Sequence, residues 1–238
     1  MGLQLMNKIA FFVEGQTEQL FVEKVIVEIA GRTKVTIEKQ RITGGVTCKR
    51  RIELIDAVKE SEKKSYFILI VDCSNDEAVK SRIVEEYDNL VKSKFTSIIG
   101  IRDLHPVARA DQAKLERGLS FRVKTQPIQV EFILAIMEIE AWFLAEYTHF
   151  VKIDAILSAE HIEEKCGFNP SVENMELRDT PAIDLKAIYQ LADKAYTKRK
   201  QNVIRTVEAL DYGRIYLDLP ERYLGLKRLV NCIESFFS

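Results

Sequence analysis

Acidic side chains follow several of the apolar segments in the N-terminal part of this chain. They are Glu14 after KIAFFV, Asp72 after YFILIV, Asp103 after SIIGIR, and Glu138 and Glu140 after VEFILAIM. The carboxyl ends of parallel strands meet at one edge of a sheet, so we expect these acids to converge. Converging carboxylates repel one another unless a cation intervenes, and Mg²⁺ or Mn²⁺ with oxygen ligands is the simplest solution. Such an ion activates water and stabilises charge on a phosphoryl group.

Each acid also has a purely structural interpretation. Asp76 and Asp103 are suited to cap a following helix, because a carboxylate there accepts backbone N–H bonds. Glu14 is harder to explain in this way, since Thr17 is the better cap and Glu18 can serve the first helical turn. The same holds for Asp72 at the end of its strand.

Glu138 and Glu140 interrupt the most apolar stretch of the chain and lie next to Trp142. An unpaired carboxylate costs several kcal/mol to bury, so neither side chain is expected inside the core. Either alternation in a strand or a strand-to-helix break near Ile139 would bring one or both acids to the site. The alternative is a partly exposed edge of the sheet.

The elements that must position these acids alternate between two kinds of segment. Apolar, β-branched runs of strand length cover residues 8–13, 35–42, 66–71, 97–101 and 130–137. Helical spacing of apolar residues covers residues 20–29, 50–61 and 76–94, and Gly31 is expected to end the first helix. This alternation predicts an α/β fold with a mostly parallel central sheet and helices on both faces.

The pattern changes after about residue 150. Residues 172–210 and 220–238 have helical spacing, with prolines as punctuation. We therefore expect an α/β domain over residues 1–150 and a helical C-terminal subdomain over residues 151–238.

Composition excludes several classes of protein. The net charge of −1 provides no general attraction for nucleic acid or anionic membranes, so any such role depends on local patches. No apolar run reaches the roughly 20 residues that a membrane helix needs. The four cysteines are scattered, and with no signal peptide evident we expect reduced thiols in a cytoplasmic protein.

Three motifs in order resemble the Toprim (topoisomerase–primase) domain. The first is FFVEG followed by QTE and a helix, where the family's glutamate maps onto Glu14. The second is ILIVDCSND, where the first of two family aspartates maps onto Asp72 and the second falls on Ser74. A serine is a weak metal ligand, so this half-site is incomplete unless Asp76 or another acid replaces it.

The third motif, MEIEAWFLAE, resembles uncharacterised Toprim-like bacterial proteins related to the overcoming-lysogenisation-defect nucleases, which are often found in anti-phage loci. Their Glu-x-Glu-Ala-Trp maps onto Glu138, Glu140 and Trp142, and their later tyrosine and lysine onto Tyr196 and Lys198.

The resemblance implies a nuclease that depends on Mg²⁺ or Mn²⁺ and acts as an anti-phage defence effector, with catalytic residues Glu14, Asp72 and Glu140. Glu138 and Asp76 are expected as further metal ligands, and Glu14 is alternatively the general acid or base. The resemblance also implies an ATPase partner, which would be separately encoded because this chain has no G-x-x-x-x-G-K-[ST] loop. The sequence does not decide between a monomer and a homodimer.

Two basic clusters are candidates for contacting a phosphate backbone. Lys49, Arg50 and Arg51 follow the Gly44-Gly45 pair, and Lys198 and Lys200 lie in the segment TKRK. Backbone amides and cations together can hold phosphates. Solvated surface is the alternative for both clusters.

Two other functions stay open. One is a non-catalytic subunit that binds an ATPase partner, which the departure at Ser74 favours. The other is a nucleotide phosphohydrolase or phosphotransferase on a related sheet.

Overall fold

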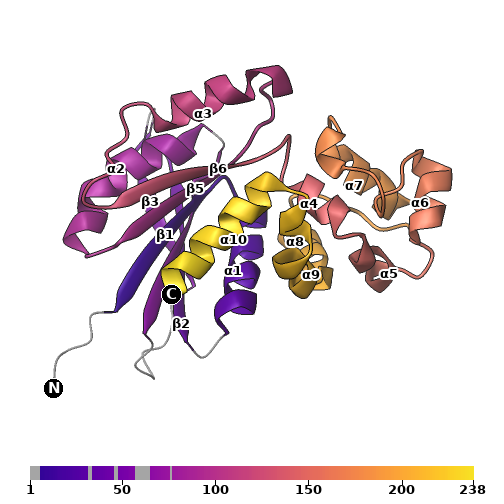
Figure 1. Cartoon of the computed structure of the whole chain (residues 1–238), viewed down its shortest axis with the longest axis horizontal. Helices are drawn as coiled ribbons and strands as arrows, with labels where there is room; N and C mark the ends of the chain where they lie inside the picture. The colour runs from indigo at the N-terminus through magenta and orange to yellow at the C-terminus, as the bar shows by residue number, and fades with distance from the viewer. Residues whose placement is uncertain (1–5, 32–33, 46–47, 57–64, 76) are drawn as a thin grey trace. The chain divides into compact units, whose positions relative to one another are not determined.

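The computed structural model describes residues 6–31, 34–45, 48–56, 65–75 and 77–238 (Figure 1). Within these residues the chain forms two compact units. We call the first the sheet unit: it comprises Met1–Arg102, Ala113–Leu134 and Cys232–Ser238. We call the second the helical unit: it comprises Asp103–Gln112 and Ala135–Asn231.

Six strands form the sheet: β1 (Asn7–Val13), β2 (Val35–Thr43), β3 (Arg51–Asp56), β4 (Tyr66–Asp72), β5 (Ser97–Asp103) and β6 (Gln129–Ala135). Their order is β3-β2-β4-β1-β5-β6. β1 is parallel to β4 and β5, and β4 is parallel to β2, whereas β2 and β3 are antiparallel. The predicted α/β fold with a mostly parallel sheet and a helical C-terminal region is confirmed.

Helices cover the sheet on both faces. α2 (Ala78–Lys92) and α3 (Gln112–Ser120) lie on one face, and α1 (Gln16–Ala30) lies on the other (Figure 1). Side chains alternate between faces along a strand, so Phe12 and Val71 turn towards α2 and pack with its Val79 and Ile83. The apolar character of β1 and β4 follows from this burial on both sides.

The segment 50–61, predicted as a helix, is a strand where the structure describes it. β3 pairs with β2 along the edge of the sheet, and residues 57–61 lie outside the described range. The sequence RIEL at the start of β3 alternates charged and apolar residues with a period of two, and Ile55, which interrupts the alternation, lies at the register shift against β2. Both faces of this edge strand are largely exposed: the apolar Ile52 and Leu54 are 55% and 54% exposed, and Ile55 is half-buried. The alternation should have outweighed the helical spacing.

The helical unit contains short helices around an aromatic core. Its helices are α4 (Glu140–Ala145), α5 (Phe150–Ile153), α6 (Ala159–Cys166), α7 (Pro181–Gln190), α8 (Lys200–Ala209), α9 (Tyr212–Leu217) and most of α10 (Leu224–Phe237). Trp142, Phe143, Phe150 and Tyr189 are fully buried. Ser158 and Asp211 cap α6 and α9 with side-chain hydrogen bonds, and Pro181 begins α7.

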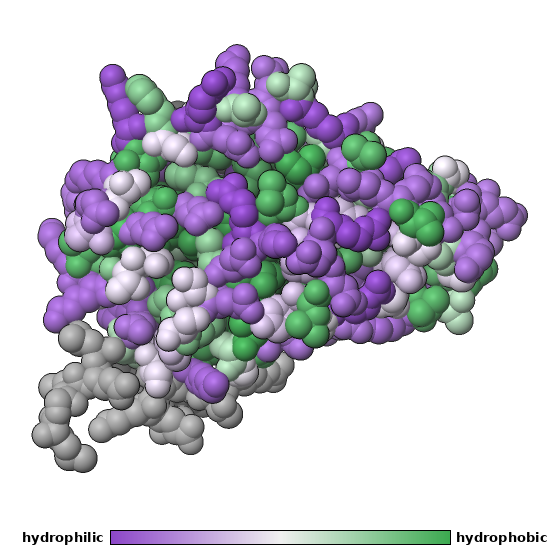
Figure 2. Space-filling model, viewed as in Figure 1, coloured by the Kyte–Doolittle hydropathy of each residue, from purple (hydrophilic) through white to green (hydrophobic). Residues whose placement is uncertain are grey.

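Among the described residues, every helix is too short or too polar to cross a lipid bilayer. Figure 2 shows hydrophilic residues spread over the visible face, with hydrophobic residues scattered between them.

Candidate functional site

Glu14 and Asp72 lie at the same end of two neighbouring strands. Asp72, the last residue of β4, is opposite Val13 in the parallel register with β1, and Glu14 follows Val13 directly. The two residues are only 8% and 3% exposed. Burial raises the pKa of the Cys73 thiol, and the negative charges of Asp72 and Glu14 raise it further. Both carboxylates therefore act on one small region at this edge of the sheet, as predicted for strand ends.

Asp72 is held by one side chain and one backbone amide. Its Oδ2 accepts a hydrogen bond from Nε of Arg41 at 2.7 Å, and its Oδ1 accepts one from the backbone N–H of Ser74 at 2.8 Å. Ser74 has a positive φ of 69°, and its hydroxyl donates to the carbonyl of Ile42 at 3.0 Å. Ser74 thus stabilises the turn after β4.

Gly15 separates Glu14 from the first turn of α1. A Cβ added at Gly15 would lie 3.3 Å from Oε2 of Glu18, so the glycine lets that carboxylate approach the backbone closely. Thr17 was predicted as the helix cap, but the N-cap is Gly15 and no side chain caps this end. Gln19 in the first turn donates to the carbonyls of Gln40 and Ile70, which anchors α1 on β2 and β4.

The first basic cluster is only partly available for a ligand. Arg50 forms ion pairs with Glu86 and, at 3.3 Å, with Glu85, whereas Lys49 and Arg51 are exposed. Gly44 and Gly45 both have positive φ, and the buried Arg82 donates to the carbonyl of Gly44. The glycine pair is therefore fastened to α2.

Asp76, predicted as a metal ligand or a helix cap, lies outside the described residues. The residues that are described contain no group of three or more His, Cys, Asp or Glu side chains suited to a metal ion. The remaining predicted acids divide between the two units: Glu14 and Asp72 belong to the sheet unit, and Glu138 and Glu140 to the helical unit.

In the helical unit, Glu140 meets two residues that are distant in sequence. It is the first residue of α4 and fully buried, so the expectation that neither acid lies inside the core is wrong for Glu140. Its Oε1 accepts hydrogen bonds from the Tyr196 hydroxyl at 2.7 Å and from Nζ of Lys198 at 3.3 Å. Its Oε2 is buried and has no hydrogen-bond partner among the described residues. The side chain of Lys198 is 70% exposed, so a buried carboxylate anchors an outward-facing cation.

A sharp turn carries Glu138 and Glu140 out of the strand. β6 ends at Ala135, Met137 has a positive φ of 61°, and α4 begins at Glu140, which confirms the predicted strand-to-helix break. Asp103 braces this turn through a 2.9 Å hydrogen bond from the backbone N–H of Ile139. Its predicted role as cap of the following helix is wrong, because the chain continues to residue 112 before α3 begins.

Glu138 is half-buried, and its Oε2 accepts a 2.8 Å hydrogen bond from the backbone N–H of Ala182 at the start of α7. Burial raises the pKa of Glu138 above its usual 4.5, the Ala182 hydrogen bond opposes that rise, and the charge of Glu140 adds to it. The folded chain therefore holds this proton more tightly than the unfolded chain does.

This raised pKa has a consequence for stability. The contribution of Glu138 to the free energy of unfolding is most favourable at low pH. It is lost as the pH rises from about 4.5 through the raised pKa of this carboxyl group. We expect Glu138→Gln, which keeps an oxygen acceptor for Ala182, to gain stability relative to the wild type as the pH rises. Urea unfolding at several pH values measures this difference.

Glu160→Gln is the matched control, because hydrogen bonds at the start of α6 lower the pKa of the exposed Glu160. Its stability relative to the wild type should fall as the pH rises. If the stability of Glu138→Gln relative to the wild type changes with pH in the same direction as that of Glu160→Gln, the pKa of Glu138 is not raised in the folded chain.

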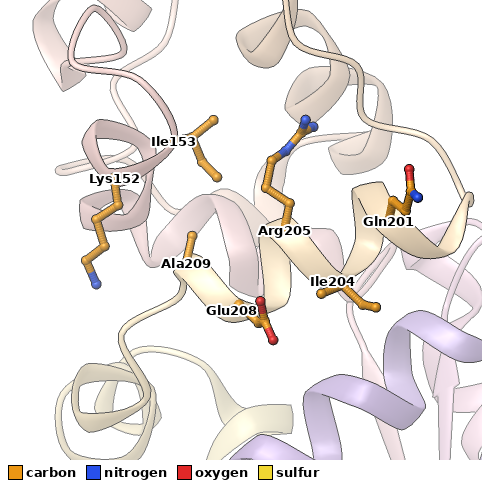
Figure 3. Close-up of a pocket in the computed structure, with 7 residues that line it drawn as sticks. All are labelled: Lys152, Ile153, Gln201, Ile204, Arg205, Glu208 and Ala209. Carbon is orange, nitrogen blue, oxygen red and sulfur yellow. The ribbon is translucent and has the colours of Figure 1, made fainter.

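A separate hollow of about 590 Å³ opens between α5 and α8 in the helical unit (Figure 3). It is lined by Lys152, Ile153, Gln201, Ile204, Arg205, Glu208 and Ala209. None of the predicted acids lines it. Lys200, the last residue of the TKRK segment, is the exposed first residue of α8.

Arg41, the partner of Asp72 at the edge of the sheet, was not predicted from the sequence. It is one of several charged residues in β2, and nothing in its spacing separates it from Lys39. A cation near the carboxyl end of a strand in a largely parallel sheet was the available signal.

Comparisons with known proteins give a family but no activity. No curated protein matches the chain. Among solved structures it is similar to the hypothetical protein PH0156 from Pyrococcus horikoshii OT3, with 16% sequence identity and a TM-score of 0.47 over 98% of this chain and 100% of that one. Residues 13–215 match the model of the family described as Domain of unknown function (DUF4276), and the chain belongs to that family.

Proposed function

We propose that the sheet unit is the catalytic centre of a Toprim-like nuclease that uses Mg²⁺ or Mn²⁺ to hydrolyse phosphodiester bonds of DNA or RNA. The observation that supports it most strongly is the pair of nine-tenths-buried acids, Glu14 and Asp72, at the ends of the adjacent parallel strands β1 and β4. Ligands of open parallel sheets bind outside these strand ends.

The donor set suits a hard divalent cation. Mg²⁺ is usually held by one or two carboxylates, with water and substrate phosphates completing its octahedron, so two acids are enough. When bound, the ion would activate water and neutralise charge on the phosphoryl group. Glu14 and Asp72 would hold the ion and orient it, and their burial would limit the water around it. Asp76, Glu138 and Glu140 remain predicted further ligands.

The helical unit offers a contact for the substrate backbone. Lys198 is exposed yet tethered through Nζ to Glu140, which Tyr196 also holds. A cation that is oriented in this way loses less side-chain entropy when it binds a phosphate. We include Lys198 among the proposed nucleic-acid contacts, together with Lys49, Arg51 and Lys200. In a chain of net charge −1, such contacts must be local.

A non-catalytic subunit in the cytoplasm, bound to a separately encoded ATPase, is the second candidate. Two features favour it. The hydroxyl of Ser74 is committed to the carbonyl of Ile42, and Asp72 already has a cationic partner in Arg41. A site of this kind can keep its fold without metal.

The test is cleavage of single- and double-stranded DNA and RNA by the full chain with Mn²⁺, Mg²⁺ or a chelator, with nucleotides included in the same screen. We expect metal-dependent cleavage of a polynucleotide. Glu14→Gln should lower it at least tenfold, since even residues that only support metal ligands contribute roughly 10–100-fold to affinity or activity.

Glu28→Gln is the matched control, because it makes the same change at an exposed acid of α1 and should leave cleavage unchanged. Full activity in Glu14→Gln would remove Glu14 from the mechanism. An inactive wild-type chain that also binds no Mn²⁺ would favour the non-catalytic subunit, and turnover of nucleotides alone would favour a phosphohydrolase.

A further inference from the structure

We propose that Arg41 is a built-in counter-cation, which competes with the divalent ion for Asp72 and binds a phosphate oxygen of the substrate once the ion has taken that carboxylate. This inference rests on the proposed function and adds a residue that contacts the substrate.

The competition follows from how Asp72 is bonded. Arg41 and Asp72 are register partners in the parallel pair of β2 and β4, and Arg41 reaches Oδ2 through Nε at 2.7 Å. The other oxygen, Oδ1, accepts from the backbone N–H of Ser74. The Ser74 amide belongs to the turn after β4, whereas a side chain can swing away. An ion that binds Asp72 through Oδ2 therefore competes with Arg41 for that oxygen.

Arg41 is suited to leave and to find another anion. Its side chain is 33% exposed, against 4% for that of Asp72. It contacts the carboxylate through Nε, and among the described residues its two terminal nitrogens make no hydrogen bond. Guanidinium presents five N–H donors in a fork that matches phosphate, so the released group can hold phosphate with two parallel hydrogen bonds.

Lys39 provides a matched control on the same strand. It lies two residues before Arg41, so both side chains project from the same face of β2. Its Nζ pairs with Glu23 at 2.7 Å and with Asp56 at 3.4 Å, and not with Asp72. Replacing either residue by glutamine removes one positive charge from β2. Only the change at Arg41 removes the partner of Asp72.

The first experiment titrates Mn²⁺ by calorimetry into the full-length wild type, Arg41→Gln and Lys39→Gln without substrate. We expect Arg41→Gln to bind Mn²⁺ roughly three- to tenfold more tightly than the wild type, because a partly exposed ion pair is a modest competitor. Lys39→Gln should bind Mn²⁺ as the wild type does. Circular dichroism of each variant checks that it is folded.

The second experiment titrates inorganic phosphate into the Mn²⁺-loaded proteins. Arg41→Gln should bind phosphate at least about tenfold more weakly than the wild type. Arg41→Lys serves as a second variant that keeps the charge: its Mn²⁺ affinity should be close to that of the wild type, but its phosphate affinity lower, because ammonium lacks the planar fork.

The outcomes separate this inference from the proposed function. If the Mn²⁺ affinity of Arg41→Gln is equal to or lower than that of the wild type, Arg41 does not compete for Asp72. The proposed metal site is not contradicted by that result. If neither the wild type nor Arg41→Gln binds Mn²⁺, the role of Arg41 and the proposed metal-dependent function are both contradicted. Tighter Mn²⁺ binding with unchanged phosphate binding would overturn the substrate contact.

Discussion

Replacement of Asp72 by asparagine is expected to lower metal-dependent phosphodiester cleavage by more than about 100-fold. Asparagine keeps the size of the side chain and a carbonyl oxygen for the backbone N–H of Ser74, but it removes the negative charge that the ion requires. A lost ligand should cost more than the roughly 10–100-fold that follows from the loss of an outer-shell partner.

The fold should tolerate this change. The lost interaction is the ion pair with Arg41, whose side chain is one-third exposed, so we expect the free energy of unfolding to fall by only about 1 kcal/mol. Thermal unfolding and Mn²⁺ calorimetry on the same preparation separate a lost site from a lost fold.

Asp88→Asn is the matched control for Asp72→Asn. Asp88 lies on α2 and pairs with Lys124 at 2.8 Å, and both side chains are mostly exposed. The variant should keep full cleavage and full Mn²⁺ affinity. Cleavage by Asp72→Asn within a few-fold of the wild type would rule out Asp72 as a ligand. Equal losses in both variants would indicate a general effect of charge.

Replacement of Trp142 by alanine is expected to lower the free energy of unfolding by about 3–5 kcal/mol. Trp142 is fully buried in the helical unit, so the change removes a large apolar surface and leaves a cavity. It also removes the indole N–H that donates to Oε1 of Glu176 at 3.2 Å. Burial raises the pKa of Glu176, and this hydrogen bond opposes the rise.

Trp142→Phe separates the two contributions to this loss. Phenylalanine retains most of the apolar volume but cannot donate to Glu176, so a smaller loss of about 1–3 kcal/mol is expected. Trp142 is the one tryptophan of the chain, so both variants are best compared by urea unfolding followed with far-ultraviolet circular dichroism. A loss below about 1 kcal/mol in Trp142→Ala would show that the helical unit does not depend on this side chain.

Patterns with a clear period in the sequence predicted most of the sheet correctly. β1 and β4 are mostly apolar because helices cover both faces of the sheet there, and their composition alone predicted strands. β3 was misassigned because a short stretch of alternating residues can match a helical template as well. What decides its structure is pairing with β2, a contact that forms only when the sheet assembles.

The sequence predicted only those residues of the candidate site that follow a local pattern along the chain. Glu14 and Asp72 could be found because each follows an apolar strand, and the ends of parallel strands share one edge of a sheet. Arg41 could not be found, since its importance depends on β2 lying next to β4 in register, with Arg41 opposite Asp72. Strand order is a property of the whole sheet.

The sequence by itself therefore determined the α/β class, the helical C-terminal region and the acids that close β1 and β4, because each leaves a local pattern of burial along the chain. Only the tertiary structure decided which partner each buried charge has. Asp72 meets Arg41, and Glu140 meets Tyr196 and Lys198 from 56 and 58 residues away. The physical reason is that hydrogen bonds and ion pairs act over a few ångströms in space, while the sequence records only distance along the chain.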